Sequence, residues 1–129
     1  VKKEIINIIF KKKGGLKKLE KIIHPMVRKE MLVFLSKNKN KKFIFFEIPL
    51  LIESKLTKYF DVIIFLKSKK SLRLKRFKQK KGSVELFRLL DENQIKDTKK
   101  MKMCDHIVVN NKSLFILKKN LLNIIKLYE

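Results

Sequence analysis

The sequence predicts an α/β fold in which helices flank a parallel sheet. Three short apolar runs have the length and composition of buried strands, at 43–48, 62–66 and 107–109. Segments with a helical spacing of apolar residues separate these runs, which favours parallel strands joined by crossover helices. No internal repeat and no second core is visible in the 129 residues, so we expect a single domain.

The N-terminal part is predicted to be helical. Residues 1–10 carry an apolar stripe, 11–15 interrupt it with Lys and Gly, and 16–23 form a second helical face. The His-Pro pair at 24–25 is expected to open another helix, because proline suits a first helical position, where its missing N–H needs no partner. A loop rich in Lys and Asn follows at 36–42.

The middle of the chain predicts two strands around a short helix. Four large apolar residues begin the run at 43–48, and Pro49 ends this strand because it has no N–H to donate to a neighbouring strand. A short helix is expected at Glu53–Tyr59 and a buried strand at Val62–Leu66.

The C-terminal half alternates helices with a third strand. Ser68, Ser83 and Ser113 each precede a helical pattern and are predicted N-caps. Asn110 and Asn111 make a turn after the strand. The expected elements are helices at 69–79, 84–90, 93–103 and 114–127 and a strand at 107–109.

A net charge of +22 is the most prominent feature of the composition. It comes from 30 Lys but only 4 Arg, in a chain that has no Ala. Arg is the residue suited to bidentate phosphate and base contacts, whereas Lys acts mostly as a point charge. We therefore favour lysines solvated on every exposed face, and keep a dedicated nucleic-acid surface as the alternative.

The remaining composition predicts a cytoplasmic protein with no membrane partner. No apolar run reaches the 18 or so residues of a membrane span, and the N-terminus does not resemble a signal peptide. The single cysteine, Cys104, fits a reducing compartment and is expected to fill core space. The spacing of Cys104, His106 and His24 does not predict a metal site.

Four motifs occur in a fixed order along the chain. They are Leu-Glu-Lys-Ile-Ile-His-Pro at 19–25, Pro-Leu-Leu-Ile-Glu at 49–53, an Arg and a Lys four residues apart at 76–80, and a spaced set of Gln, Lys, Cys-Asp and Ile-Val-Val-Asn at 94–110. This ordered set resembles the dephospho-CoA kinase family over nearly the whole chain. The chain departs from the family pattern at three positions, with Arg73 in place of Gln, Lys80 in place of Arg and Cys104 in place of Ala.

The resemblance implies a P-loop nucleoside-kinase-like sheet that is incomplete in this chain. The chain corresponds to roughly the last two-thirds of such an enzyme, so the central P-loop strand has no counterpart. In the single partial kinase domain that it implies, 1–42 form the helical acceptor-substrate side, 43–66 the core strands, 67–92 a helix and lid, and 93–129 a helix–strand–helix.

The reaction implied by the family is phosphorylation of the 3′-hydroxyl of dephospho-CoA by ATP with Mg²⁺, the last step of coenzyme A biosynthesis. The chain has Gly only at 14, 15 and 82 and no G-x-x-x-x-G-K-[ST] sequence to cradle phosphates. We therefore expect this transferase chain to be inactive alone. The catalytic acid is expected in the part that is absent.

Arg76 and Lys80 are the expected catalytic residues. Residues four apart share a helix face, so both side chains would reach the same phosphates. An ordinary basic helix surface is the alternative from spacing alone, and Lys80 lacks the planar fork of arginine.

The other candidate residues are assigned by the resemblance. Asn110 and Glu47 are expected at the nucleotide, where Asn110 would contact adenine and Glu47 would hold a Mg²⁺-bound water. The residues expected on the dephospho-CoA side are His24, Pro49, Leu50 and Glu53. A packed histidine, solvated or helix-terminal carboxylates and a turn asparagine are the structural alternatives.

Three interpretations of function therefore remain open. The first is the C-terminal part of a dephospho-CoA kinase, the second a small basic nucleic-acid-binding module, and the third a truncated gene product without activity. A nucleic-acid module would gather Lys and Arg on one face, which distinguishes it from the first. The sequence does not predict an oligomeric state.

Overall fold

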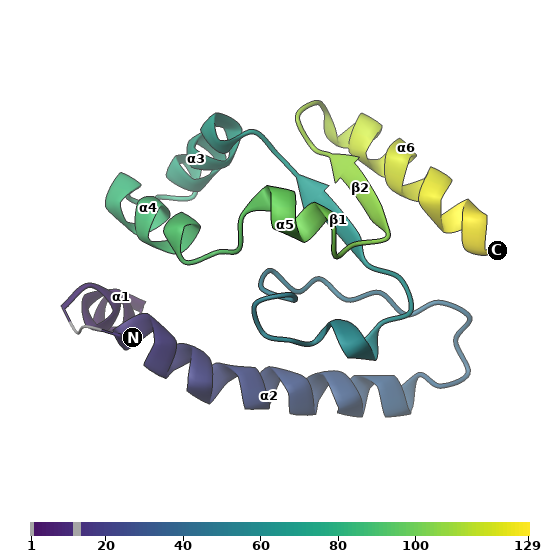
Figure 1. Cartoon of the computed structure of the whole chain (residues 1–129), viewed down its shortest axis with the longest axis horizontal. Helices are drawn as coiled ribbons and strands as arrows, with labels where there is room; N and C mark the ends of the chain where they lie inside the picture. The colour runs from purple at the N-terminus through teal and green to yellow at the C-terminus, as the bar shows by residue number, and fades with distance from the viewer. Residues whose placement is uncertain (1, 12–13) are drawn as a thin grey trace. The chain divides into compact units, whose positions relative to one another are not determined.

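The computed structural model describes residues 2–11 and 14–129. The chain divides into two compact units, Val1–Ile48 and Pro49–Glu129 (Figure 1). The first unit is helical and the second contains the sheet, so the protein is α/β as predicted. None of the helices in the described residues combines the length and apolarity of a membrane-crossing segment.

The first unit consists of helices α1, Lys2–Lys11, and α2, Gly15–Lys37. Of the break predicted at 11–15, residues 12–13 lie outside the described residues, as does Val1 of the first predicted helix. Gly14 has a φ of 77°, which favours glycine before a helix. A Cβ on Gly15 would lie 2.5 Å from the carbonyl oxygen of Ile8, so glycine lets α2 begin close against α1.

The prediction that a new helix opens at 24–25 is wrong, because Pro25 lies inside α2. Proline removes one intrahelical hydrogen bond, which normally favours a break. Here the apolar residues before and after Pro25 keep one helical period, so the side chains on both sides of the proline favour a single continuous helix.

The predicted strand at 43–48 does not form. In place of ladder partners the segment has ring contacts, with Phe46 edge-on to Phe34 at 5.5 Å and Phe43 stacked with Phe45 at 6.2 Å between centroids. A strand exists only when a neighbouring strand takes up its backbone N–H and C=O groups. The sheet of the described residues has two strands that pair with each other and not with this segment.

The second unit is built on strands β1, Ile64–Lys67, and β2, His106–Val109. They pair in parallel, in register from Ile64 opposite His106 to Lys67 opposite Val109, which confirms the parallel pairing expected for these two runs. The helices of this unit are α3 Lys70–Gln79, α4 Val84–Glu92, α5 Asp97–Met101 and α6 Leu114–Ile125. Helix α5 packs beside β1, and α6 beside β2 (Figure 1).

The helix predicted at 53–59 is replaced by turns and a short 3₁₀ segment, Thr57–Tyr59. The Ser54 hydroxyl donates to the carbonyl of Leu50 at 2.6 Å, and such local bonds compete with helix formation. Lys55 then adopts a φ of 57°, which ends any right-handed helix. Leu56, 1% exposed, anchors the turn in the core.

Two of the three predicted serine caps are confirmed. Ser83 accepts from the backbone N–H of Leu86 at 3.1 Å, and Ser113 accepts from that of Ile116 at 3.4 Å. Ser68 does not cap α3, because its hydroxyl donates to the Asn110 carbonyl.

Helix α5 is shorter than the helix predicted at 93–103. The N–H of Ile95 donates to the Glu53 carboxylate and not to a helical carbonyl.

Candidate functional site

The carboxyl ends of β1 and β2 meet at one edge of the sheet, where open α/β folds bind ligands. The Ser68 hydroxyl after β1 donates to the backbone carbonyl of Asn110 after β2 at 2.7 Å. The N–H of Lys69 donates to the side-chain oxygen of Asn111 at 2.9 Å. Arg76 of α3 donates hydrogen bonds to both Ser68 and Asn110. We call these three residues the strand-end junction.

Arg76 reaches the strand-end junction from α3. Its Nη1 donates to the Ser68 hydroxyl at 3.2 Å and to the Asn110 carbonyl at 3.1 Å. Both acceptors are neutral, so these bonds hold the guanidinium without cancelling its charge. The structure thus brings this predicted catalytic residue to the carboxyl ends of the strands, the position at which open α/β sheets bind ligands.

Lys80, the second predicted catalytic residue, follows the last residue of α3. Its backbone N–H closes the helix on the carbonyls of Arg76 and Phe77, and its side chain is exposed. A side chain in this position is free to move toward an anion, but no contact joins it to the strand-end junction among the described residues.

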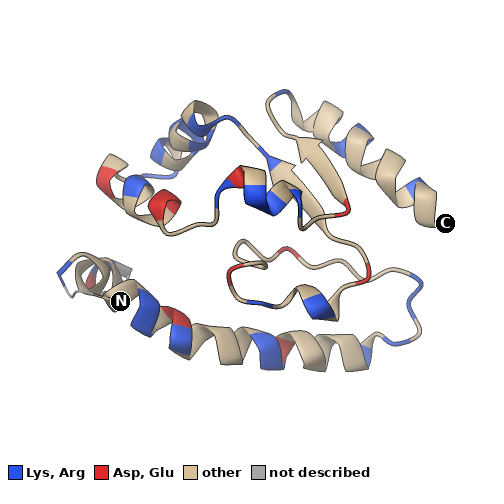
Figure 2. Cartoon of the chain, viewed as in Figure 1, with Lys and Arg blue, Asp and Glu red and all other residues tan. Residues whose placement is uncertain are grey.

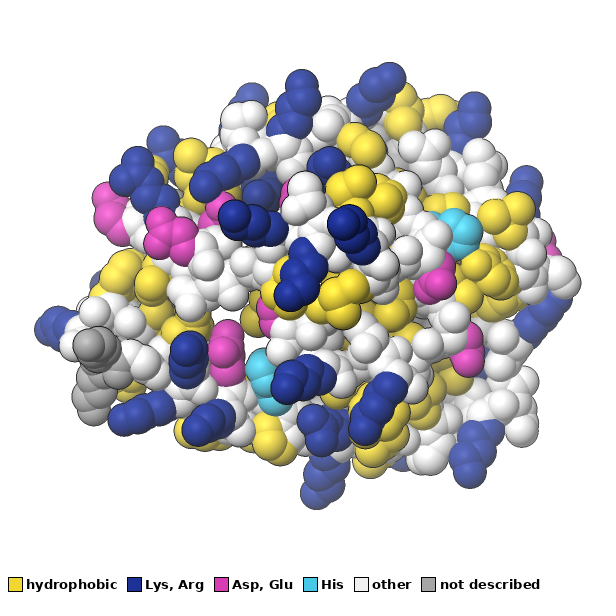
Figure 3. All heavy atoms as spheres, viewed as in Figure 1, with side chains coloured by type: hydrophobic (Ala, Val, Ile, Leu, Met, Phe, Trp, Pro, Cys, Tyr) yellow, Lys and Arg dark blue, Asp and Glu magenta, His cyan; other side chains and the backbone are white. Residues whose placement is uncertain are grey.

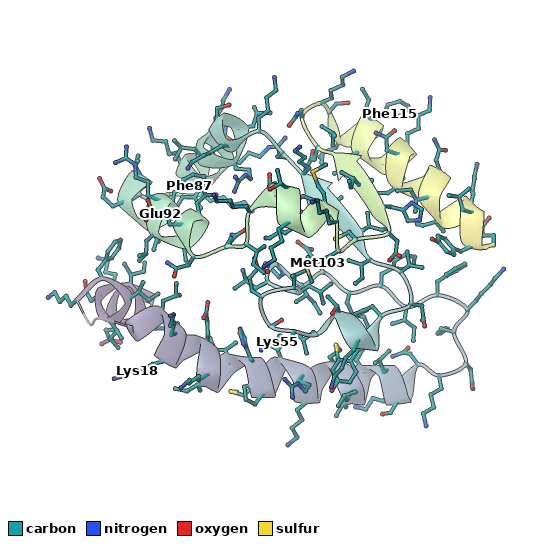
Figure 4. The ribbon with its side chains drawn as sticks, viewed as in Figure 1. Lys18, Lys55, Phe87, Glu92, Met103 and Phe115 are labelled. Carbon is teal, nitrogen blue, oxygen red and sulfur yellow. The ribbon has the colours of Figure 1, made fainter. Side chains whose placement is uncertain are left out.

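Helices α3 and α4 are joined by one carboxylate. Asp91 of α4 pairs with Arg73 at 2.6 Å and with Lys70 at 2.8 Å. The ring centroids of Phe77 and Phe87 lie 5.7 Å apart, and Phe87 is labelled on α4 in Figure 4. A Cβ on Gly82 would collide with the Phe77 ring, so glycine is needed in the connecting turn.

The environment of Asp91 shifts its acidity. Burial acts to raise the pKa of Asp91, but hydrogen bonds and charge from Lys70 and Arg73 outweigh it and hold that pKa below the ordinary value. A carboxyl group with a lowered folded-state pKa stabilises the fold above its unfolded pKa of about 4, and this contribution is lost as the pH falls through the folded value.

We expect Asp91→Asn to destabilise the chain at neutral pH by about 1.5–3 kcal/mol, the range for hydrogen bonds to charged groups. Lys70 is 63% exposed and adds little to this. Urea unfolding measured from pH 7 to pH 3 should show the variant and the wild type converging at the acid end. Glu92→Gln, at an exposed neighbour on α4, is the matched control (Figure 4). A difference independent of pH would contradict the assignment.

A second polar cluster, the Glu53–Lys100 cluster, lies in the interior of the second unit. The Glu53 carboxylate pairs with Lys100 Nζ at 2.8 Å, with side chains 13% and 7% exposed. Lys100 also donates to the side-chain oxygen of Gln94 at 3.1 Å, and its Nζ lies 5.9 Å from the centre of the Phe65 ring. The cluster ties the turn after Pro49 to α5 and β1. Sequence reasoning placed Gln94 and Lys100 among the ordered motifs but did not find their pairing with Glu53.

An open groove of about 520 Å³ lies at the same edge of the sheet as the strand-end junction. Val109 and Ile116 give it apolar surface, and polar groups come from Lys69, Asn111, Lys112 and Asn120. Asn111 lines the groove, whereas the backbone carbonyl of the predicted Asn110 belongs to the junction. An apolar wall with a few amide and ammonium groups suits a planar base carrying hydrogen-bonding edges.

The remaining candidate residues are divided between the units. His24 lies within α2 and is partly exposed, and Glu47 is exposed in the unpaired segment of the first unit. Pro49 and Leu50 start the turn that opens the second unit, where the Leu50 carbonyl accepts from Ser54. Their expected substrate roles stay predictions. Cys104, expected in the core, is partly buried, and burial raises the pKa of its thiol.

Basic side chains are dispersed in each unit. Lys and Arg lie on α2 in the first unit and on α3, α5 and α6 in the second (Figure 2). On the visible face of each unit they are interspersed with apolar side chains (Figure 3). This view therefore gives no support to the nucleic-acid alternative, which requires a single basic face.

Parallel strands, intervening helices and a cation held at the carboxyl ends of the strands define an α/β protein whose candidate site lies at the sheet edge. A family model for dephospho-CoA kinase matches residues 2–115. The chain therefore belongs to the dephospho-CoA kinase family, which confirms the resemblance found in the ordered motifs.

Several curated relatives bear the name dephospho-CoA kinase. The protein from Rickettsia conorii is 28% identical over 125 residues, which cover 96% of this chain and 65% of the relative. The protein from Rickettsia bellii is 29% identical over 95% of this chain and 64% of the relative. That from Fusobacterium nucleatum is 33% identical over 88% and 58%. The chain thus spans about 65% of the length of the Rickettsia conorii relative.

Proposed function

We propose that the chain contributes the acceptor side and part of the nucleotide side of a dephospho-CoA kinase, a phosphotransferase with a P-loop nucleoside-kinase-like fold. The reaction moves the γ-phosphoryl group of ATP to the ribose 3′-hydroxyl of dephospho-CoA. The observation that supports it most directly is the Arg76 guanidinium held at the sheet edge by neutral acceptors. Phosphoryl transfer depends on positioning and on stabilising developing negative charge, and such a cation does both.

The nucleotide is proposed to lie along the sheet edge. The phosphates would approach Arg76 and Lys80, and the adenine base would enter the groove beside Asn111, with Asn110 at its edge. Mg²⁺, implied by the family, keeps several waters and takes few protein carboxylates beside substrate phosphates. Glu47, an exposed carboxylate of the first unit, is proposed to hold a metal-bound water, a role for which one carboxylate is enough. When bound, the ion would neutralise phosphate charge.

Dephospho-CoA is proposed to contact the turn that begins at Pro49 and Leu50 in the second unit. His24, in the first unit, keeps its expected role as a separate proposal. Glu53 supports that turn from behind, because its carboxylate accepts from the N–H of Ile95 at 3.0 Å and pairs with Lys100. The turn therefore cannot shift without breaking an interior ion pair. A rigid turn holds an acceptor hydroxyl in line for transfer, which is a large part of catalysis in reactions of this class.

The proposal is tested with a fusion. The segment of the Rickettsia conorii relative that lies outside the match, which the resemblance implies to contain the Gly-rich loop, is joined to this chain. Formation of CoA and ADP is then measured by chromatography. Dephospho-CoA-dependent ADP formation supports the proposal. A folded fusion that makes no CoA, beside an active Rickettsia conorii enzyme, contradicts it.

Arg76→Ala in this fusion should lower kcat by about 10²-fold, the scale found when one donor to developing charge is removed. The KM for dephospho-CoA should change little, because the guanidinium acts on transition-state charge and not on acceptor binding. Arg88→Ala is the matched control, since Arg88 is an exposed arginine on α4. An unchanged kcat would place Arg76 on a merely solvated face of α3.

A further inference from the structure

Ser68 is a buried polar residue, 9% exposed, whose hydroxyl joins three elements. It donates to the Asn110 carbonyl at the end of β2 and accepts from Arg76 Nη1 of α3, while it stands itself at the end of β1. A hydroxyl has one donor and two acceptor sites, so it can serve both partners at once. Arg76 Nη1 also donates to the Asn110 carbonyl, which closes a triangle of three mutually bonded groups.

This triangle fixes one edge of the Arg76 guanidinium and leaves the other edge available. Both hydrogen bonds that Arg76 makes to described residues of the second unit use Nη1. A guanidinium carries five N–H donors, so Nη2 and Nε keep the geometry of a fork for an anion. Arg73, one helical turn earlier, is by contrast neutralised by Asp91 at 2.6 Å.

We propose that Ser68 is a positioning residue, which holds Arg76 so that its free edge faces a phosphate group at the strand ends. The inference rests on the proposed function and deepens it by assigning a residue that acts on the ligand only through Arg76. Without the hydroxyl, Arg76 keeps its bond to the Asn110 carbonyl but loses one of two anchors. The guanidinium then samples other rotamers, and anion binding weakens.

The test uses the 129-residue chain with inorganic tripolyphosphate as the probe and adenosine as the uncharged comparison. Binding is followed by NMR through the Arg76 Nε–H signal. Ser68→Ala should weaken tripolyphosphate binding about 3- to 10-fold, the equivalent of one lost hydrogen bond, and leave adenosine binding unchanged. Ser68→Thr keeps the hydroxyl and should restore the affinity. Ser83→Ala removes a capping hydroxyl elsewhere, at α4, and should not change it.

Three results would overturn the inference: tripolyphosphate that does not shift the Arg76 signal in the wild type, equal affinity in wild type and Ser68→Ala, or an equal loss in Ser83→Ala. Urea unfolding of each variant shows whether an affinity loss merely follows a stability loss. The fusion assay distinguishes a failure of the Ser68 positioning role from a failure of the proposed kinase function. An active fusion whose kcat and KM are unchanged by Ser68→Ala refutes the positioning role alone. An inactive fusion with the Ser68 effect intact refutes the kinase activity alone.

Discussion

The purified 129-residue chain is expected to form no CoA from dephospho-CoA and ATP by itself. Kinases of this class hold the β- and γ-phosphates with backbone N–H groups of a Gly-rich loop. None of the three glycines is available for such a loop. Gly14 precedes α2 and Gly15 begins it, against the Ile8 carbonyl, and Gly82 lies against the Phe77 ring. A single guanidinium such as that of Arg76 is not enough to align the phosphates for transfer.

A coupled assay of the chain with saturating substrates checks this expectation, with the Rickettsia conorii relative as the positive control. Turnover of about 1 s⁻¹ or more, an ordinary kinase rate, would contradict it. The Arg76→Ala variant of the chain guards against a contaminating kinase, because contaminant activity would not respond to it. The fusion then shows whether CoA is formed once a phosphate-binding loop is supplied.

The parts of the fold that were predictable from the sequence are those governed by local patterns. The runs at 62–66 and 107–109 are apolar on both faces, and both became paired strands. Ser83 and Ser113 sit immediately before amphipathic helices, and both cap them. For the caps, the signal and the structure it specifies lie within three residues of one another. For the strands, local composition indicated the type of element, and each run then found the other as its partner.

The errors arose where distant partners or competing local signals decide the structure. The run at 43–48 has strand composition, but it pairs with neither of the two strands. Ser68 looked like a helix cap, yet its hydroxyl is taken by a carbonyl 42 residues away. At Pro25 the side-chain period outweighed the usual proline signal, and α2 continued through it.

The sequence was enough to predict Arg76 as a residue of the candidate site, but not the groups that Arg76 contacts. Arg76 was selected by the resemblance, and it lies at the carboxyl ends of the strands. Its anchors were not predictable: the signal of Ser68 indicated a helix cap, and a backbone carbonyl such as that of Asn110 carries no side-chain signal. Lys100 is one of 30 lysines, and nothing in the sequence shows that it is buried. The structure shows that Lys100 is buried, with 6% of its surface exposed, and that it pairs with Glu53.

Lys100→Met should be severely destabilising, with a loss of about 3–5 kcal/mol, the cost of removing one partner from a buried ion pair. Methionine keeps most of the volume of the lysine stem, so the loss comes from the charge. The Glu53 carboxylate would still accept a hydrogen bond from the Ile95 N–H, but it would lose its cation. Because the Glu53 side chain is only 13% exposed, water would solvate the unpaired charge poorly. The attraction between Lys100 and the Phe65 ring would be lost as well. Against a typical domain stability of about 5–15 kcal/mol, this change can unfold the second unit.

Urea unfolding followed by circular dichroism measures this loss, and Lys99→Met, at an exposed neighbour on α5, is the matched control. The double variant Glu53→Gln with Lys100→Met tells a charge effect from a packing effect. If the unpaired carboxylate is what destabilises Lys100→Met, then removing its charge should recover part of the stability, and the two substitutions will not be additive. A loss within about 0.5 kcal/mol, as for an ordinary surface lysine, would show that water replaces the cation and that the cluster does not hold the turn in place.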